Sequence, residues 1–379
     1  MADMAKRAIV RLTPNNRHRV LFGHPWIFSN EILSVDGHAE PGDIVEVRDR
    51  RDKFVGQGYI NPQSAITVRM LTREEEQIDE AFIRERVRQA VHYREAIYGE
   101  PGPLGRSPKG YRLVFSEGDF LPGLIVDLFG GYLVFQTLTL GIDKWKETVL
   151  DALRDFVEPK GIYERNDAPV RELEGLTQQA RFIGRPFDPL VEMDENGVTI
   201  VVDTQKGQKT GYFLDQTDNR LAIRAFCPGK TVLDAFSYSG GFGLSAALAG
   251  ADRVVCVDVS DAALDLARAG AAKNGFTGKM TLRNANVFDI LREFETNGVR
   301  FDVVMLDPPA FARSRKMLGR ALTGYKEINL RAMKIVKEGG FVCTSSCSQH
   351  VTKEEFDQML DGAAADSKKT VRMVERPSI

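Results

Sequence analysis

The feature that most constrains the fold is an alternation of apolar runs and helix-like stretches from about residue 198 onward. The runs TVLDAF, RVVCVDV, MTLRNAN, FDVVMLD and GGFVCTSS have the length of strands, and helical periodicity fills the stretches between them. Strands that are apolar on both faces and joined by helices are typical of parallel sheets covered on two sides. This part of the chain is therefore predicted to be a doubly wound α/β domain, with ligands beyond the carboxyl ends of its strands.

The rest of the chain has a different pattern. At about 150 residues per domain, 379 residues predict two to three domains. Short β-like runs separated by proline and glycine turn signals up to residue 72 predict a small β-rich module. A helix-period segment and further strand-like runs then predict a mixed α+β block. We place the domains at 1–72, 73–190 and 191–379.

Charge, cysteine pattern and hydropathy exclude several classes of protein. The 51 basic and 53 acidic residues give a net charge of −2, unlike a general polyanion binder, although a local basic face can still bind nucleic acid. Four cysteines without CxxC spacing and only five histidines argue against a disulfide scaffold and against a metal site. The N-terminus has no signal-like apolar run and no stretch approaches 18 apolar residues, which predicts a cytoplasmic protein without a membrane span.

A glycine-rich turn follows the first strand of the α/β region. In VLDAFSYSGGFG the strand leads into Gly240, Gly241 and Gly243, and a helix follows. Such glycines let the backbone approach a ligand, and Asp258 at the end of the next strand can accept hydrogen bonds from ribose hydroxyls. The spacing is not G-x-G-x-x-G, so a nucleoside-type ligand is favoured over a dinucleotide. The structural alternative is that these are ordinary turn glycines beside a helix-capping Asp.

Two further motifs fall at the predicted ligand-binding edge. Asp307 in LDPPAF directly follows a strand, and two prolines hold its carboxylate in place. A loop of this kind can present acceptors to the Watson–Crick edge of a flipped base. Cys347 in TSSCSQH ends the last strand and is a candidate nucleophile, the alternative being a small buried hydrophobic residue. His350 is expected to be a loop or capping residue rather than an assistant to the thiol.

Two segments concentrate positive charge. Residues 313–337 hold eight basic side chains and one acid directly after the Asp-Pro-Pro loop. Their position favours contact with a phosphate backbone over a merely solvated helix face. Near the N-terminus, Arg7, Arg17 and Arg19 precede the aromatic motif HPWIF. This region is either a solvated face beside a buried aromatic pair or an RNA-contacting surface.

Together, these motifs resemble the class I S-adenosylmethionine-dependent RNA methyltransferases with an N-terminal PUA domain, in particular the bacterial cytosine-C5 methyltransferases of large-subunit ribosomal RNA. HPWIFSNEI and PGDIVEV are similar to the PUA module, and the block ending in YERND to the central domain. QKGQKTGYFLDQTDNR, DAFSYSGGFG, DPPAF, GYKEIN and SSCS follow in the family's order. The resemblance covers nearly the whole chain and implies a Rossmann-like methyltransferase domain behind a PUA domain and an α+β domain.

The resemblance also implies S-adenosylmethionine as cofactor, RNA as substrate and a role for each motif residue. Cys347 would add to C6 of cytosine so that C5 can attack the methyl group, and Asp307 would act near N3. The implied cofactor-binding residues are Tyr212, Phe213, Asp215, Arg220, Asp234, Gly240, Gly241, Gly243, Asp258, Asn286 and Asp307. The expected RNA-contacting residues are Arg7, Arg17, Arg19, Arg313, Arg315, Lys316, Arg320, Tyr325 and Lys326.

Other functions remain open at the level of sequence. An exocyclic-amine methyltransferase would use the Asp-Pro-Pro motif without a thiol, and a non-catalytic RNA-binding assembly factor would use the PUA module alone. A nicotinamide-dependent dehydrogenase is the weakest alternative, and a homodimer is compatible with all of them. Near the C-terminus the run TVRMVER is strand-like, whereas family members usually continue into one more strand that closes an antiparallel hairpin.

Overall fold

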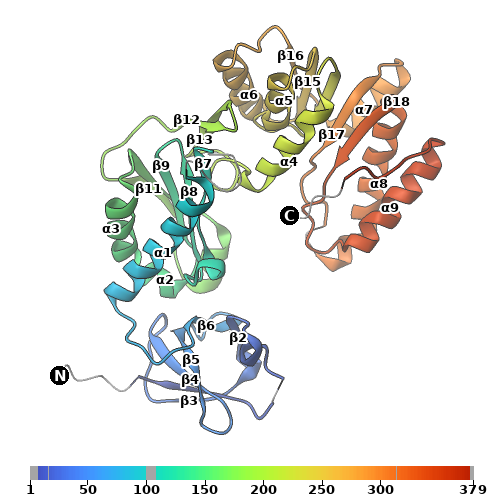
Figure 1. Cartoon of the computed structure of the whole chain (residues 1–379). Coiled ribbons are helices and arrows are strands. Elements are labelled where there is room, and N and C mark those ends of the chain that lie inside the picture. Colours follow the sequence, from blue (N-terminus) through green and yellow to red (C-terminus); the bar gives the residue numbers. More distant parts are fainter. Residues whose placement is uncertain (1–6, 16, 100–107, 313, 376–379) are drawn as a thin grey trace. The chain divides into compact units, whose positions relative to one another are not determined.

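The computed structural model describes residues 7–15, 17–99, 108–312 and 314–375, and the chain divides into two compact units (Figure 1). Unit one comprises residues up to 191 together with 204–206, and unit two comprises 192–203 and the chain from 207 onward. The predicted boundaries at 72 and 190 stay a prediction. In the part of the chain described, no helix has the length and apolarity needed to cross a bilayer.

Unit one begins with a six-stranded sheet in the order β2-β6-β5-β4-β1-β3. Its strands are β1 (Ile9–Leu12), β2 (Trp26–Phe28), β3 (Ile32–Asp36), β4 (Ile44–Arg48), β5 (Phe54–Ile60) and β6 (Ile66–Thr72). β1 pairs with β4 in parallel, and every other neighbouring pair is antiparallel. Alternate residues such as Val45 and Val47 enter one apolar core, as the period of a half-buried strand requires. The predicted β-rich module is confirmed.

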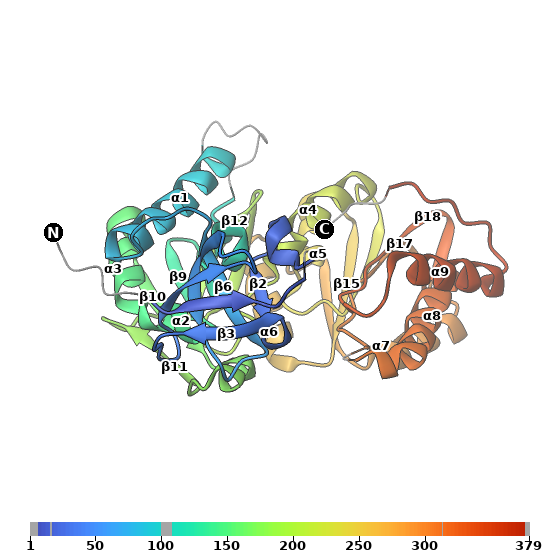
Figure 2. The same ribbon diagram turned by 90° about the horizontal axis from the view of Figure 1, so that it is seen from below.

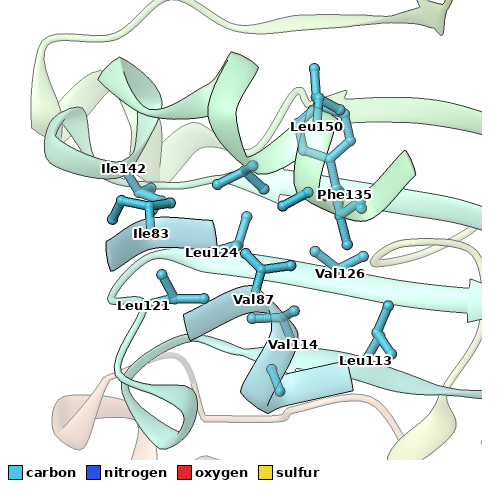
Figure 3. Packing of buried hydrophobic residues seen from close by; sticks show 14 of the residues in the cluster. Ile83, Val87, Leu113, Val114, Leu121, Leu124, Val126, Phe135, Ile142 and Leu150 are labelled. Carbon is cyan, nitrogen blue, oxygen red and sulfur yellow. The ribbon is translucent and has the colours of Figure 1, made fainter. Parts of the chain in front are cut away.

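The second part of unit one is a five-stranded sheet in the order β11-β10-β9-β8-β7. The elements are α1 (Glu80–Tyr98), β7 (Gly110–Phe115), β8 (Leu124–Phe129), β9 (Tyr132–Thr137), α2 (Leu140–Lys144), α3 (Lys146–Val157), β10 (Gly161–Asn166) and β11 (Gln179–Ile183). Figure 3 shows Ile83 and Val87 of α1 in the same apolar cluster as Leu124 and Val126 of β8. Helices packed on a mixed sheet confirm the predicted α+β block.

Polar contacts join these two parts of unit one. The hydroxyl of Tyr59 donates to the carbonyl oxygen of Pro122 and lies 3.1 Å from Thr139 Oγ1. The indole N–H of Trp26 donates to Glu117 Oε1 at 2.6 Å. Trp26 of the HPWIF motif is therefore half-buried and already hydrogen-bonded, which supports the structural alternative for this aromatic residue.

Unit two is built on a five-stranded parallel sheet in the order β16-β15-β14-β17-β18. The elements around it are the hairpin β12 (Leu190–Glu195) and β13 (Val198–Asp203), then α4 (Thr217–Ala222), β14 (Thr231–Ala235), α5 (Gly241–Leu248), β15 (Arg253–Asp258), α6 (Asp261–Lys273), β16 (Met280–Asn284), α7 (Val287–Thr296), β17 (Phe301–Leu306), α8 (Leu318–Ile335), β18 (Val336–Thr344) and α9 (Lys353–Ser367). Figures 1 and 2 show α7, α8 and α9 together on one side of the sheet and α5 and α6 on the other. The predicted doubly wound α/β fold is confirmed.

The strand order of unit two reverses between β14 and β17. Ala235 at the end of β14 lies in register with Leu306 at the end of β17, and Leu306 lies in register with Thr344 of β18. The carboxyl ends of these three parallel strands therefore meet at one edge of the sheet. This reversal is the place where open α/β sheets bind their ligands.

The last described segment differs from its predicted structure. Residues 370–375, which belong to the strand-like run TVRMVER, form no strand. Val371, Met373 and Val374 are exposed there, so the apolar residues of this run do not contribute to the core of a sheet.

Candidate functional site

The loop after β14 is held to the neighbouring strand by backbone hydrogen bonds. Phe236 and Tyr238 have φ angles of 64° and 46°, which non-glycine residues rarely adopt. The N–H of Ser237 donates to the carbonyl of Val257 at 3.0 Å, and the N–H of Tyr238 donates to Asp258 Oδ2 at 2.8 Å. Strained backbone held by its surroundings is typical of functional loops.

The glycines that follow are required by close packing inside the protein. A Cβ on Gly241 would lie 2.4 Å from Tyr212 Oη, and one on Gly243 would lie 2.5 Å from Cys256 Sγ. Gly240 has a φ of +77°, which favours glycine. The turn therefore needs glycine at these positions whether or not a ligand approaches it.

Three buried oxygens beside this turn have no hydrogen-bond partner within the described residues: Asp234 Oδ1, Ser237 Oγ and Ser239 Oγ. The other carboxylate oxygen of Asp234 accepts the N–H of Gly243 at 2.8 Å, and burial raises the pKa of Asp234 to about 7. Buried polar atoms are normally hydrogen-bonded, so this group of unpaired oxygens fits a polar ligand at the turn.

Arg220 is neutralised by Glu195, a residue that sequence reasoning missed. The Nε and Nη2 atoms of Arg220 each lie 2.7 Å from an oxygen of Glu195, and both side chains are buried. The guanidinium lies 4.5 Å from the ring centroid of Tyr212, whose hydroxyl is beside Gly241. We assign Arg220 to holding Tyr212 against the glycine turn; its expected contact with a cofactor stays a prediction.

Phe213 and Asp215 belong to a segment that is pinned to the glycine loop by Tyr238. The Tyr238 hydroxyl accepts the N–H of Gln208 at 2.9 Å and donates to the carbonyl of Gly211 at 3.1 Å. Within this segment Lys209 Nζ lies 3.1 Å from both carboxylate oxygens of Asp215 and 4.4 Å from the Phe213 ring. The segment therefore lies against the glycine loop, and the expected cofactor contacts of Phe213 and Asp215 stay a prediction.

Asp258 ends β15 and Asn286 follows the neighbouring strand β16, and both accept backbone hydrogen bonds there. Asp258 Oδ1 accepts the N–H of Ser260 at 2.9 Å, and Ser260 caps α6. Asn286 is exposed and caps α7 by accepting the N–H of Phe288 at 2.9 Å. Asp258 thus accepts a hydrogen bond at the start of α6, as the structural alternative for this residue expects. The expected contacts of Asp258 and Asn286 with a cofactor stay predictions.

Asp307 lies at the edge of the sheet and is held by two residues that sequence reasoning missed. Its Oδ1 accepts hydrogen bonds from Gln216 Nε2 at 2.9 Å and from Ser345 Oγ at 2.6 Å. Burial raises the pKa of Asp307, although the Ser345 hydrogen bond opposes that shift. Gln216 and Ser345 lie in the motifs YFLDQ and TSSCS, but nothing in these motifs predicts that both side chains contact Asp307.

Cys347 is the exposed one of the four cysteines, whereas Cys227 and Cys256 are buried and Cys343 is intermediate. Its thiol donates to the carbonyl oxygen of Pro308 at 3.5 Å, so it lies beside the Asp-Pro-Pro loop. Partial burial and the charge of Asp307 raise the pKa of Cys347. The structure therefore brings the predicted nucleophile and the predicted carboxylate to one edge.

Tyr325 does not belong to an RNA-contacting surface, and its expected role is corrected. Its side chain is fully buried, with ring contacts to Phe311 at 4.6 Å and Phe356 at 5.8 Å. Its hydroxyl oxygen lies 2.8 Å from Ser348 Oγ. An RNA molecule cannot reach this ring without unfolding the site, so Tyr325 is a packing residue behind the Cys347 loop.

The basic run at 313–337 divides into a neutralised half and an exposed half. Lys326 pairs with Asp366 at 2.7 Å, Lys334 with Glu295 at 3.0 Å, Lys337 with Asp302 at 2.8 Å, and Arg331 with Glu295 and Glu327. Arg315, Lys316 and Arg320 are exposed and form no ion pair with any described residue. Arg313 lies outside the described residues. The ion pair with Asp366 weakens the expectation that Lys326 contacts a phosphate.

The basic N-terminal residues differ in their surroundings. Arg17 and Arg19 are exposed and form no ion pair within the described part of the chain. Arg7 donates to the backbone carbonyl of Glu76 at 3.3 Å. No cluster of three His, Cys, Asp or Glu side chains with a metal-binding arrangement occurs among the described residues.

Known proteins resemble this chain along nearly its whole length. It is 41% identical to ribosomal RNA large subunit methyltransferase I of Vibrio cholerae over 357 residues, which is 93% of this chain and 89% of that protein. The protein of the same name from Shewanella denitrificans is 40% identical over 97% of this chain and 92% of its own length. Two methyltransferase structures share the fold. The structure from Streptococcus mutans has a TM-score of 0.75 at 20% identity and covers 94% of this chain and 90% of that chain. The other, a putative methyltransferase complexed with SAH, has a TM-score of 0.77 at 21% identity and covers 94% of this chain and 89% of that chain.

Two family models match the regions described above. Residues 10–73 match the PUA-like domain, which is the six-stranded sheet of unit one. Residues 180–378 match the S-adenosylmethionine-dependent methyltransferase family, and this region contains the glycine turn, Asp307 and Cys347. The match spans more than half of the chain, and the relatives agree with it. The chain therefore belongs to the S-adenosylmethionine-dependent methyltransferase family.

Proposed function

We propose that this chain methylates large-subunit ribosomal RNA at C5 of a cytosine, with Cys347 as the nucleophile. The relatives named ribosomal RNA large subunit methyltransferase I and the PUA-like domain support RNA as the substrate. The observation that carries the choice of C5 is the exposed Cys347 beside the Asp-Pro-Pro loop, at the edge where Asp307 follows β17. An amino-group methyltransferase does not need a thiol at this position.

The residues at the glycine turn fit the family's cofactor. S-adenosylmethionine supplies an electrophilic methyl group when it is bound. The unpaired oxygens of Asp234, Ser237 and Ser239 match the amino and hydroxyl donors and the carboxylate acceptor that this molecule carries. Asp258 would accept hydrogen bonds from the ribose, and Asn286 would serve the adenine. Tyr212 and the segment bearing Phe213 and Asp215 would enclose the site.

Cys347 and Asp307 supply the chemistry that an aromatic base requires. The Cys347 thiolate adds to C6 of cytosine, which forms a sulfur–carbon bond and moves the C5–C6 π electrons toward C5. N3 takes up a proton during this addition, and Asp307 would supply it. After substitution at C5, a base removes the C5 proton. N3 gives its proton back to Asp307 as the sulfur–carbon bond breaks, and the thiolate is released.

The exposed half of the basic run supports phosphate contacts near this edge. Arg315, Lys316 and Arg320 follow the Asp-Pro-Pro loop directly and have no ion-pair partner among the described residues. Arginine and lysine side chains of this kind position nucleic acid through its phosphates without reading the sequence. Arg17 and Arg19 offer a second such surface on the PUA-like domain.

The test compares two cysteine variants. We expect Cys347→Ala to lower methyl transfer to large-subunit ribosomal RNA by at least about 10³-fold while cofactor affinity stays unchanged. Cys343→Ala is the matched control, since Cys343 lies within β18 four residues before Cys347, and it should stay active. Mass spectrometry of the nucleosides identifies the product as 5-methylcytidine. Substantial C5 methylation by Cys347→Ala would exclude the mechanism, and a product methylated on an amino group would favour the exocyclic-amine alternative.

A further inference from the structure

The two carboxylate oxygens of Asp307 have unequal surroundings. Oδ1 accepts hydrogen bonds from Gln216 Nε2 and Ser345 Oγ, at 2.9 and 2.6 Å. Oδ2 receives no hydrogen bond from the described residues. The carboxyl group is thus fixed on one side and open on the other.

Both donors are themselves held in place. Gln216 is buried, its Oε1 accepts from Asn219 Nδ2 at 2.6 Å, and its N–H donates to the carbonyl of Phe213 at 3.2 Å. This pairing orients the amide so that its nitrogen faces Asp307. The N–H of Ser345 donates to the carbonyl of Leu306 at 3.0 Å, which fixes the other donor beside the end of β17.

This asymmetry decides where a proton resides when Asp307 is neutral. An oxygen that accepts two hydrogen bonds has both lone-pair directions occupied, so a hydroxyl hydrogen is favoured on the other oxygen. Burial favours the neutral form, since it raises the pKa of Asp307. The neutral acid therefore has its O–H at Oδ2, on the open side.

We propose that Gln216 and Ser345 are positioning residues that keep the proton of Asp307 on Oδ2, from which it is donated to N3 of the target cytosine. This inference rests on the cytosine-C5 reaction proposed above. N3 takes the proton as the sulfur–carbon bond forms, and the proton returns to Oδ2 when the thiolate leaves. In uracil N3 carries a hydrogen and cannot accept one, so the same arrangement selects cytosine over uracil.

The test replaces one atom of the substrate and one donor of the enzyme. The probe is transcribed large-subunit ribosomal RNA that carries cytidine or 3-deazacytidine, which lacks the N3 acceptor, at the mapped target. We expect wild-type kcat to fall on 3-deazacytidine by about a hundredfold, the usual order for a lost general acid. In Gln216→Leu and Ser345→Ala the ratio of kcat on cytidine to kcat on 3-deazacytidine should fall at least about tenfold, because the acid is no longer positioned.

The controls separate positioning from folding. Ser345→Thr keeps the hydroxyl and should restore the wild-type ratio, and Gln178→Leu replaces an exposed glutamine in unit one and should leave it unchanged. Melting temperature and cofactor affinity show whether each variant is folded. A lower kcat on both substrates with an unchanged ratio would overturn the inference and leave the role of Cys347 intact. Failure of the cysteine test would instead remove the reaction on which the inference rests.

Discussion

The hydroxyl oxygens of Tyr325 and Ser348 lie 2.8 Å apart in the interior of unit two. Ser348 directly follows Cys347, and its Oγ also accepts the N–H of Ala312 at 3.2 Å, at the end of the Asp-Pro-Pro-Ala-Phe motif. One buried serine thus connects the loop of Cys347, the loop of Asp307 and helix α8. The residue next to Cys347 is therefore hydrogen-bonded to a fully buried tyrosine.

Removing only the hydroxyl of Tyr325 tests this link. Tyr325→Phe keeps the ring in its aromatic cluster, so we expect the free energy of unfolding to fall by about 1 kcal/mol, the typical value of one hydrogen bond. The value of kcat should fall several-fold because the Cys347 loop is held less firmly, and RNA affinity should not change. Thermal unfolding, methyl-transfer kinetics and RNA titration measure the three quantities.

The matched control is Tyr93→Phe, at a tyrosine that is 58% exposed on α1. It should change neither stability nor kcat. A loss of RNA affinity in Tyr325→Phe at unchanged stability would contradict the packing role and restore the expectation that Tyr325 contacts RNA.

The reactivity of Cys347 toward iodoacetamide should depend on pH in a way that reports its environment. Partial burial and the Asp307 charge raise the pKa of Cys347, so its alkylation rate should rise about tenfold per pH unit below that pKa and level off above it. Asp307→Asn removes a negative charge that disfavours the thiolate. It should lower the pKa of Cys347 and speed alkylation at pH 8.

Peptide mass spectrometry follows Cys347 separately from the other three cysteines. Asp265→Asn, on an exposed carboxylate of α6, is the control and should leave the rate unchanged. Slower alkylation of Cys347 in Asp307→Asn would show that Asp307 assists thiolate formation in the free enzyme, contrary to this expectation.

The fold of unit two was predictable because it depends on a pattern that is local in sequence. Each apolar run covers one strand, and parallel pairing places every strand end at the same edge, which explains why Asp258, Asp307 and Cys347 could be chosen in advance. Asp307 and Cys347 do lie at one edge of the structure. The contacts that hold them were not predictable, because Gln216 and Asp307 are 91 residues apart, and Glu195 and Arg220 are 25 apart.

The ion pairs of the basic run at 313–337 were also not predictable from sequence, because their acidic partners are distant in the chain. Counting charges along residues 313–337 finds Lys334 and Lys337 but not the acids that approach from other elements. Glu295 comes from α7 and Asp302 from β17, and together they neutralise this half of the run. The period of a helix indicates which residues share a face, and only the tertiary fold decides what that face meets.

RNA affinity should therefore depend on one half of the run and not on the other. Replacing Arg315, Lys316 and Arg320 together by Ala should weaken binding to ribosomal RNA and reduce the slope of log affinity against log salt by about 2, at about 0.7 per phosphate contact for single strands. Filter binding between about 50 and 200 mM salt measures this slope.

The matched control replaces the paired lysines Lys326, Lys334 and Lys337 by Ala. It removes the same net charge, but each of these lysines is held by an acid, so the slope should change by less than half as much. Equal slopes in the two triple variants would mean that net charge alone attracts the RNA and that the exposed half contacts no phosphates.

Glu195 should be important for both stability and cofactor binding. Glu195→Gln leaves the buried Arg220 without its counter-charge, and breaking a buried pair from one side costs about 3–5 kcal/mol. Arg220 would then no longer hold Tyr212 beside Gly241, so affinity for S-adenosylmethionine should fall as well. Denaturant unfolding and calorimetric titration check the two effects.

The same hairpin supplies the control. Glu192 pairs with Lys273 at 2.8 Å, but both side chains are about half exposed, so Glu192→Gln should cost less than about 1 kcal/mol and leave cofactor affinity unchanged. The two variants make the same chemical change three residues apart, and only burial of the partner differs. Equal losses of stability would show that the pairs are equivalent and that Arg220 does not depend on Glu195 to support the glycine turn.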